Sequence, residues 1–483
     1  MKPEEVQSFA VKRAEVEFHN FASLGEPARA MAHYREQNLR RGALIRAHLD
    51  FTGPLTPFLE IGSNVGHTSY LLANDFDAAG FALDISADSL RHGVSLQEAW
   101  GMSRAPIRVA GDAAHLPFRD GSLRFVMAFQ MLSQFMDIES VFLEVKRVLA
   151  PGGVFLLSEE PLKRVLTLGL YRCPYYDTMK PWERRLYDWG LLGFLVRDVI
   201  GAHQEESFGI RQNHSLDLKR WHLLIEKHFA AHEYDISVRA TGPAERLVRR
   251  LAVKLDRYHS DWRAARLLGG TLSAFCRKAG TPSETGFAGD RFESYLRCPD
   301  CGGPFARDQS DLLRCAACGY QAANEGGVYN LLPSAERREL YPGDRADIID
   351  FSLPGHAAKL GSGWYELEGV FGNKYRWIGP RATARLAVVN PGPQRLRIRG
   401  HAQAGSFEQR APLRMEATLN GRRAGQWTLA RTGLFILECD LPDAPDYQLE
   451  IAASPVWSAP PDARALTVNL SMIRLVPGGE NSH

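Results

Sequence analysis

The first 280 residues alternate short apolar runs with amphipathic stretches. The apolar runs 58–61, 80–84 and 124–130 show no polar alternation, which indicates strands buried on both faces. Helical patterns are found at 68–73, between the first two runs, and at 141–149, after the third run, where an apolar stripe includes Phe142 and Val145. Strands and helices in alternation predict an α/β fold built on a mostly parallel sheet.

The pattern changes twice along the chain and predicts three domains, as a length of 483 residues does. Residues 4–49 are predicted helical, and two late strands, 232–239 and 270–276, are separated by an insertion. The predicted boundaries are a Rossmann-like domain with N-terminal helices at 1–280, a linker at 281–290, a cysteine module at 291–335, a second linker at 336–350 and an all-β domain at 351–478.

Short strands in the last domain predict a β-sandwich. Residues 381–389 and 396–401 alternate apolar and polar side chains, and 413–419 leads through Asn420-Gly421 into 426–429. Asn-Gly between two such runs is a hairpin signal. Further strands are predicted at 434–439, 447–452 and 466–475.

A glycine-containing loop follows the first strand. It reads Glu60-x-Gly62-x-Asn64-x-Gly66 and opens the helix 68–73. Glycine lets the backbone approach a ligand closely, and the start of a helix presents free N–H groups. Asn64 stands where a third glycine would be, and asparagine enters the left-handed region with little strain. This loop predicts a nucleotide-like ligand, although such turns also occur as plain connections.

Later motifs narrow the ligand. Asp84 ends the second strand, Asp112 precedes a Leu-Pro-Phe turn, and Pro151-Gly-Gly153 leads into the fifth strand. With the loop, these motifs resemble those of class I S-adenosylmethionine (SAM) methyltransferases of the type 11 kind. The resemblance implies that SAM is bound as follows: Glu60, Gly62, Ser63, Asn64 and Gly66 at its methionine and ribose end, Asp84 on the ribose hydroxyls, Ile85 against adenine, Asp112 and Ala113 at the adenine edge, and Phe129 and Gln130 beside the sulfonium.

The catalytic group is harder to predict. Residues 158–214 lie where this fold builds its acceptor pocket, and they contain the pair Glu159-Glu160 and His214. The two glutamates are the first candidates, against the interpretation that they are solvated carboxylates at a strand end. His214 is a weaker candidate for a general base, because an isolated histidine is usually not catalytic. A weakly acidic hydroxyl acceptor needs a base or a metal, whereas an amine acceptor does not always need either.

The cysteine module carries Cys298-x-x-Cys301 and Cys315-x-x-Cys318. Four thiolates at this spacing predict a structural Zn²⁺ with no open coordination position; the alternative is four unligated cysteines. The module resembles the small zinc-ribbon activator that partners RNA and protein methyltransferases, and the zinc module of a bacterial 23S rRNA guanine methyltransferase. Ribbons also serve as docking plates between domains.

Two further stretches bear on partners. Residues 246–266 combine an apolar helical face with basic residues, which favours a solvated, docked helix over a peripheral contact with a membrane or an anionic substrate. The segments that contain Trp364, Tyr365 and Trp377 resemble the β-sandwich ends of bacterial surface-glycan enzymes. Those rings are candidates to stack on sugars, against the alternative that they fill the core or bind another protomer.

Composition limits the classes of function and the cellular location that fit this chain. The net charge of +2 argues against a chain dominated by phosphate-backbone binding, and the first residues lack the apolar segment of a signal peptide. Four of seven cysteines in a metal pattern fit a reducing compartment, so a cytoplasmic protein is expected. The leading hypothesis is a methyltransferase that acts on a hydroxyl or amine of a sugar, glycan precursor or related metabolite. The alternatives are an RNA methyltransferase and a non-catalytic SAM-fold module that binds glycans or partners; the oligomeric state is not predicted.

Overall fold

A computed structural model describes residues 12, 27–135, 137–162, 218–237, 270–282, 287–341, 343–369, 374–389, 392–407, 412–429, 433–458 and 462–477. These residues fall into two compact units. The first comprises Met1–Phe18 and Arg35–Ser334, and the second comprises His19–Tyr34 and Ala335–His483. Each unit has its own hydrophobic core and is described by itself.

The first unit is built on an eight-stranded sheet with the order β11-β3-β2-β1-β4-β5-β7-β6. All pairs from β11 to β5 are parallel, and β7 runs antiparallel to both β5 and β6. The strands are β1 (Phe58–Ile61), β2 (Gly80–Asp84), β3 (Ile107–Ala110), β4 (Leu123–Phe129), β5 (Leu149–Leu162), β6 (Ala231–Ser237), β7 (Gly270–Arg277) and β11 (Val328–Asn330).

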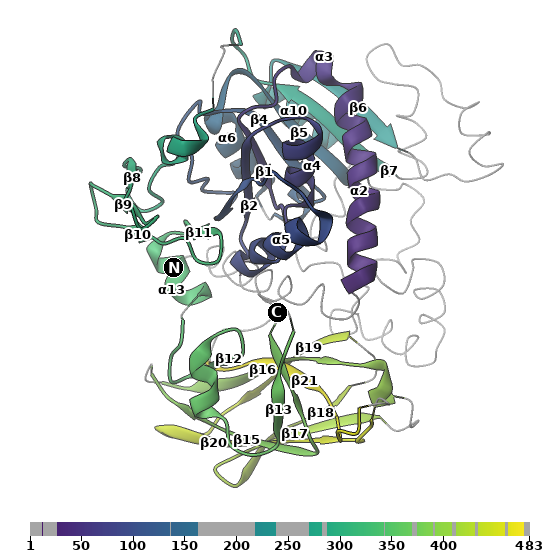
Figure 1. The fold of residues 1–483 in the computed structure, drawn as a ribbon, viewed down its shortest axis with the longest axis vertical. Helices are drawn as coiled ribbons and strands as arrows, with labels where there is room; N and C mark the ends of the chain where they lie inside the picture. Colours follow the sequence, from purple (N-terminus) through teal and green to yellow (C-terminus); the bar gives the residue numbers. More distant parts are fainter. Residues whose placement is uncertain are drawn as a thin grey trace, which may run out of the picture. The chain divides into compact units, whose positions relative to one another are not determined.

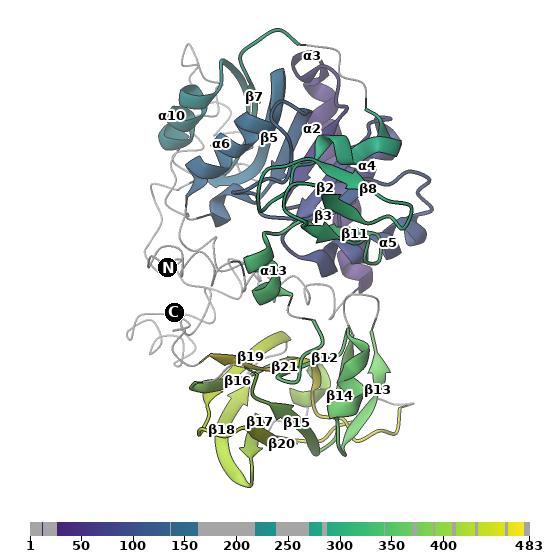
Figure 2. The ribbon, with the colours of Figure 1, turned by 90° about the vertical axis from the view of Figure 1, so that its left-hand side faces the viewer.

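Helices cover both faces of this sheet (Figures 1 and 2). One face carries α2, α4 and α5, and the other carries α6 and α10. The helices are α2 (Pro27–Ala47), α3 (Leu49–Thr52), α4 (His67–Asp75), α5 (Ala87–Trp100), η1 (Leu132–Gln134), α6 (Ile138–Val148), α10 (Leu218–His228) and η4 (Gly289–Tyr295). A further helix, α13 (Ser334–Leu340), belongs to the second unit apart from its first residue.

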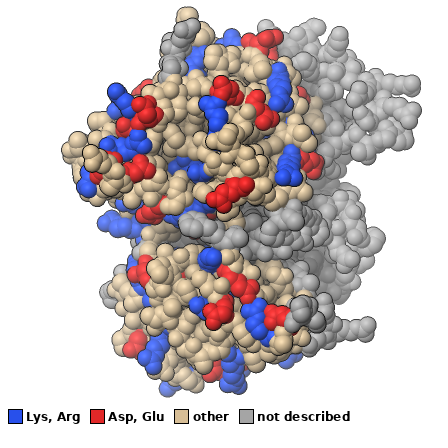
Figure 3. Space-filling model, viewed as in Figure 1, with Lys and Arg blue, Asp and Glu red and all other residues tan. Residues whose placement is uncertain are grey.

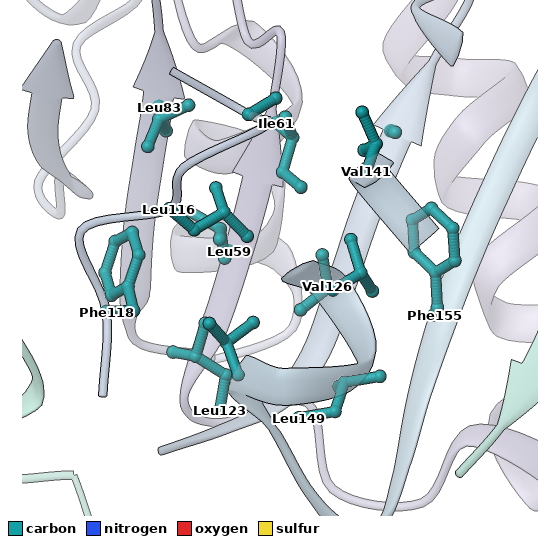
Figure 4. Close-up of a cluster of buried hydrophobic side chains, with 14 of the residues drawn as sticks. Leu59, Ile61, Leu83, Leu116, Phe118, Leu123, Val126, Val141, Leu149 and Phe155 are labelled. Carbon is teal, nitrogen blue, oxygen red and sulfur yellow. The ribbon is translucent and has the colours of Figure 1, made fainter. Parts of the chain in front are cut away.

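The two cores of the first unit follow from strands that are apolar on both faces. Leu59 and Val126 point to the face on which Val141 of α6 lies (Figure 4). The neighbouring positions Phe58 and Met127 pack on the other face. Side chains alternate along a strand, so an uninterrupted apolar run supplies both layers at once.

The cysteine module is a small three-stranded antiparallel sheet whose chain continues into the large sheet. Its strands are β8 (Phe305–Arg307), β9 (Leu313–Cys315) and β10 (Gln321–Ala322), in the order β10-β9-β8. β11 follows and pairs in parallel with β3, with Asn330 opposite Ala110. Cys298 and Cys315 are buried in the same core as α6. The module is therefore an extension of the large sheet, which the pattern of the sequence did not indicate.

The second unit contains two further sheets around one core. One sheet has the order β13-β14-β21-β16-β19 with β12 paired to β21, and the other has the order β15-β20-β17-β18. Leu396 and Ile398 of the first sheet share the core with Leu449 of the second. The strands are β12 (Ile348–Asp350), β13 (Trp364–Glu368), β14 (Tyr375–Ile378), β15 (Arg381–Ala387), β16 (Gln394–Ala402), β17 (Leu413–Leu419), β18 (Arg422–Leu429), β19 (Gly433–Asp440), β20 (Asp446–Ser454) and β21 (Asn469–Pro477), with short η5 (Pro354–Lys359) and η6 (Ala404–Phe407).

The predicted elements agree with this architecture, and two details differ. The Asn420-Gly421 turn has positive φ at both residues, as the hairpin requires. The predicted linker 336–350 contains most of α13, and its last residues form β12. The exact domain boundaries stay a prediction. The basic stretch 246–266 and most of 158–214, with His214, lie outside the described residues.

Among the helices that the structure describes, none is both long and apolar enough to cross a membrane.

Candidate functional site

The loop between β1 and α4 has the backbone that its sequence predicts. Gly62, Asn64 and Gly66 have φ values of 66°, 51° and 76°, so all three lie in the left-handed region. Gly66 is the N-cap of α4. The loop thus lies at the carboxyl edge of the sheet, where open α/β sheets bind their ligands.

Glu60 is buried beneath this loop and holds the first turn of α4. Its Oε2 atom accepts hydrogen bonds from the Ser69 backbone N–H, at 2.8 Å, and from the Ser69 hydroxyl, at 2.6 Å. Burial raises the pKa of Glu60 to about 7, although these hydrogen bonds lower it. Glu60 therefore fixes the first turn of α4, directly after the loop. Its contact with the methionine end of SAM stays a prediction.

Asp84 ends β2 and bridges two backbone segments. One carboxylate oxygen accepts from the Asn64 N–H at 2.7 Å, and the other from the Ser86 N–H at 2.9 Å. The carboxylate is 4% exposed and lies beside the glycine-containing loop. Asp84 thus contacts the loop directly, and its predicted contact with the ribose hydroxyls stays a prediction.

Asp112 follows β3 and is surrounded by donors. Lys12 Nζ, His115 Nδ1 and the Ala114 N–H each lie 2.9 Å from its carboxylate oxygens. Burial alone would raise the pKa of Asp112, but the hydrogen bond from His115 and the charge of Lys12 outweigh it and lower the pKa to about 2. Asp112 is therefore ionised, and its predicted contact with the amino group of adenine stays a prediction.

The other predicted donor-site residues border the same edge. Ser63 and Ala113 are buried, whereas Ile85 is half-buried just after β2. Phe129 ends β4, and Gln130 follows it with a positive φ of 53°. The structure thus brings the predicted residues after β1, β2, β3 and β4 to one edge of the sheet.

Comparisons with known proteins agree with this arrangement. Residues 59–157 match the family of methyltransferase domains. This match runs from β1 into β5 and supports a methyltransferase core in the first unit.

Curated relatives of this methyltransferase core cover a limited part of the chain. The norajmaline N-methyltransferase of Rauvolfia serpentina is 23% identical over 128 residues, which are 26% of this chain and 41% of that protein. The sterol 24-C-methyltransferase of Aspergillus fumigatus is 31% identical over 152 residues, 32% of this chain and 37% of that protein. The chain spans between 37% and 44% of the length of the curated relatives it matches.

Among solved structures, the phosphoethanolamine N-methyltransferase 2 of Haemonchus contortus, in complex with SAM, is 17% identical to this chain. The similarity covers 50% of this chain and 52% of that one, with a TM-score of 0.32.

Glu159 lies at the carboxyl end of the methyltransferase core, in an irregular part of β5. The register between β5 and β7 shifts between Leu157 and Glu160, and Glu159 has a φ of 60°. Both of its oxygens accept from Arg41 of α2, at 3.3 and 2.8 Å. Its side chain is 17% exposed, so the carboxylate lies near the site without being open to bulk solvent.

Glu160, the second member of the predicted pair, points into the protein. It is fully buried, and its oxygens accept from the backbone N–H groups of Met131, Leu132 and Ser133 at 2.9–3.1 Å. Burial raises the pKa of Glu160 to about 7, although these donors lower it. Through these hydrogen bonds Glu160 fixes the turn after β4. The two glutamates are therefore not a solvated pair. A catalytic role for Glu160 stays a prediction.

Sequence reasoning missed the residues that α2 contributes. Arg41 contacts Glu159, His67 and Thr68, and Asn38 Nδ2 donates to the His67 carbonyl at 2.9 Å. The only available signal was an arginine within a helix predicted to cover the cofactor mouth. Nothing in the pattern marked it as buried.

The four cysteines of the ribbon converge. Their Sγ atoms all lie within 4.8 Å of one another, and the Cys298–Cys318 and Cys301–Cys315 pairs are each 3.5 Å apart. A disulfide needs about 2.05 Å, so neither pair is bonded. A tetrahedral zinc ion with Zn–S bonds of about 2.3 Å separates its sulfur ligands by about 3.8 Å. The donor set and its spacing fit Zn²⁺.

The candidate sugar-stacking rings of the second unit largely pack against, or hydrogen-bond to, other residues of the same unit. Trp377 is 6% exposed and packs edge-on against Trp457, with ring centroids 5.6 Å apart. Trp364 packs against the core, and its indole N–H donates to the Thr383 carbonyl at 2.7 Å. The hydroxyl of Tyr365 bonds to the backbone of Ala465. These contacts favour a structural role for the three rings.

Proposed function

We propose that this protein is a SAM-dependent methyltransferase whose donor site is the carboxyl edge of β1–β4. The observation that carries the proposal is the pair of buried carboxylates, Asp84 at the end of β2 and Asp112 after the adjacent strand β3, on one side of the glycine-containing loop that follows β1. A carboxylate beside the loop matches the ribose hydroxyls, and an ionised carboxylate after β3 matches an amino group of adenine. SAM supplies a methyl group activated by its sulfonium, and the protein positions it.

The acceptor we propose is a hydroxyl or amine of a sugar, glycan precursor or related metabolite. Curated relatives named for norajmaline, ajmaline, tocopherol and sterols support a small-molecule acceptor, whereas another is named for malonyl-[acyl-carrier protein]. Basic and acidic side chains are interspersed on the face drawn in Figure 3, and the net charge is +2. Neither feature favours RNA, whose recognition depends on basic surface.

We further propose that Cys298, Cys301, Cys315 and Cys318 bind a structural zinc ion. Four sulfur ligands close the coordination sphere, so the metal would hold the ribbon and would take no part in methyl transfer.

The donor site is tested by calorimetric titration of the full chain with SAM. Wild type should bind, and Asp84→Asn should weaken binding by about tenfold or more, because a charged hydrogen bond is worth about 1.5–3 kcal/mol. Asparagine keeps one acceptor oxygen for the Asn64 N–H but loses the acceptor for the Ser86 N–H, so thermal unfolding of the variant checks that it is folded. Asp50→Asn, exposed in the first turn of α3, is the matched control. No heat with wild type at about 100 μM SAM, a concentration inside the usual range of enzyme–substrate affinities, would remove the enzyme proposal.

The acceptor class is tested by transfer of a labelled methyl group from SAM into a cell extract. Label in the small-molecule or glycan fraction supports the proposal, and label in RNA establishes the alternative. Binding of SAM without any transfer would favour the non-catalytic module.

A further inference from the structure

Helix α2 places a polar face against the carboxyl edge of the large sheet. Gln37, Asn38 and Arg41 are 7%, 8% and 5% exposed, and positions four apart on a helix share one face. Within the described part of the chain, Gln37 Oε1 and Asn38 Oδ1 have no hydrogen-bond partner. Buried acceptors without partners are costly, which indicates that this face belongs to a site that takes a ligand.

Arg41 is the centre of this face and is fixed by three other elements. It donates to both oxygens of Glu159, within the irregular part of β5, and to Thr68 Oγ1 of α4 at 2.8 Å. Its Nη1 lies 3.0 Å from His67 Nε2, and its guanidinium carbon lies 4.1 Å from the centre of the Phe129 ring at the end of β4. The fork geometry of arginine suits such bidentate binding of a carboxylate.

Glu159 has an unusual backbone at the position that Arg41 grips. A φ of 60° is unfavourable for a residue with a Cβ atom, and such strain persists where the surroundings over-determine it. Strained residues cluster at active sites because strain there fixes a side chain in one direction. The two hydrogen bonds from Arg41 hold the Glu159 carboxylate in this direction.

We propose that Arg41 is a positioning residue, which holds the Glu159 carboxylate beside the sulfonium of bound SAM. The inference rests on the proposed function. During transfer, an acceptor lone pair forms the new bond to the methyl carbon, the C–S pair returns to sulfur, and the acceptor's proton passes to solvent. The positive charge moves from sulfur toward the acceptor, and a fixed carboxylate stabilises it at both ends.

This placement predicts that the site distinguishes SAM from S-adenosylhomocysteine (SAH), which lacks the positive charge. The measurement is the ratio of the two dissociation constants, taken by calorimetry on the full chain with thermal unfolding as the check on folding. Wild type should prefer SAM. Glu159→Gln should reduce that preference by about tenfold, a change of about 1.4 kcal/mol, with SAH affinity nearly unchanged.

Variants of Arg41 separate positioning from simple neutralisation. Arg41→Gln should also reduce the preference for SAM, because Glu159 is no longer held, and Arg41→Lys should restore part of it by keeping one charged donor. If Arg41 only neutralised Glu159, Arg41→Gln would increase the preference for SAM instead. That result, or a ratio unchanged in both Glu159→Gln and Arg41→Gln, would overturn the proposal.

Two controls complete the experiment. Arg46→Gln removes an exposed arginine of the same helix, which pairs with Asp75 on the surface, and should leave the ratio at the wild-type value. If wild type binds neither SAM nor SAH, the proposed function fails at an earlier step. The two failures are therefore distinguishable.

Discussion

Glu60 and Glu160 are buried carboxyl groups whose pKa values are raised to about 7 from an ordinary 4.5. Between these two values the folded protein binds more protons than the unfolded chain. The contribution of these two groups to the free energy of unfolding is therefore largest below about pH 4.5. It falls as the pH rises toward 7, by at most about 1.4 kcal/mol per group and pH unit.

Replacing either glutamate should flatten this dependence. We expect the unfolding temperature of Glu60→Gln, and of Glu160→Gln, to fall less between pH 5 and pH 7 than that of wild type. Glu98→Gln, exposed on α5, serves as the control and should follow wild type. Parallel curves for all four proteins would contradict the assignment of raised pKa values.

Gly62 is restricted by space as well as by its backbone. An added Cβ would lie 2.6 Å from Met131 Cγ, and φ is 66°. Gly101 also has a left-handed φ, 63°, but an added Cβ there would meet nothing within 4 Å. Left-handed strain of about 1–2 kcal/mol is therefore common to Gly62→Ala and Gly101→Ala. Gly62→Ala should lower the unfolding temperature more, because only its Cβ clashes with Met131. Gly62→Ala should also weaken SAM binding; equal melting and equal affinity in the two variants would show that the close approach is not important.

At the scale of single residues, the sequence predicts those features that depend on the conformation of the local backbone. Asn64 was expected in the left-handed region, and its φ is 51°. Arg41 was not expected, since its partner Glu159 is 118 positions away in the chain. The fate of the two adjacent glutamates was equally hidden, because their divergence depends on an irregularity in β5.

At the scale of elements, the ribbon should depend on its metal. Cys318→Ser should lower zinc content and increase hydrogen exchange in β8–β11, because ligation is the proposed link between the knuckles. Tyr320, two positions after Cys318, donates to the carbonyls of Asn330 and Leu332, so β11 should loosen with the ribbon. Cys439→Ser, in the other unit, is the control for loss of a thiol. Exchange in β11 that stays at the wild-type rate would argue against this link.

The order of elements in the methyltransferase core was predictable because each strand is a continuous apolar run. β11 was not, because a three-residue strand has no periodicity, and its partner β3 lies more than two hundred residues earlier. The same reason explains why β12 lay inside a predicted linker.

At the scale of the molecule, two separate cores predict two unfolding transitions. SAM should raise the temperature of one transition only, because a ligand stabilises the unit that binds it. Ile398→Ala, in the core of the second unit, should lower the other transition by removing buried apolar contacts. The measurement is scanning calorimetry with and without SAM. A single transition that both changes move together would show that the units unfold as one.

The pairing of β11 with β3 also determines how this sheet can meet other chains. An outermost strand normally exposes unpaired N–H and C=O groups, which invite a second polypeptide to add a strand there. Here the same chain fills that place after the ribbon, and a tethered strand is present at a local concentration that a free competitor would have to exceed. An external strand is therefore excluded beside β3, and in the described sheet β6 is the other outermost strand.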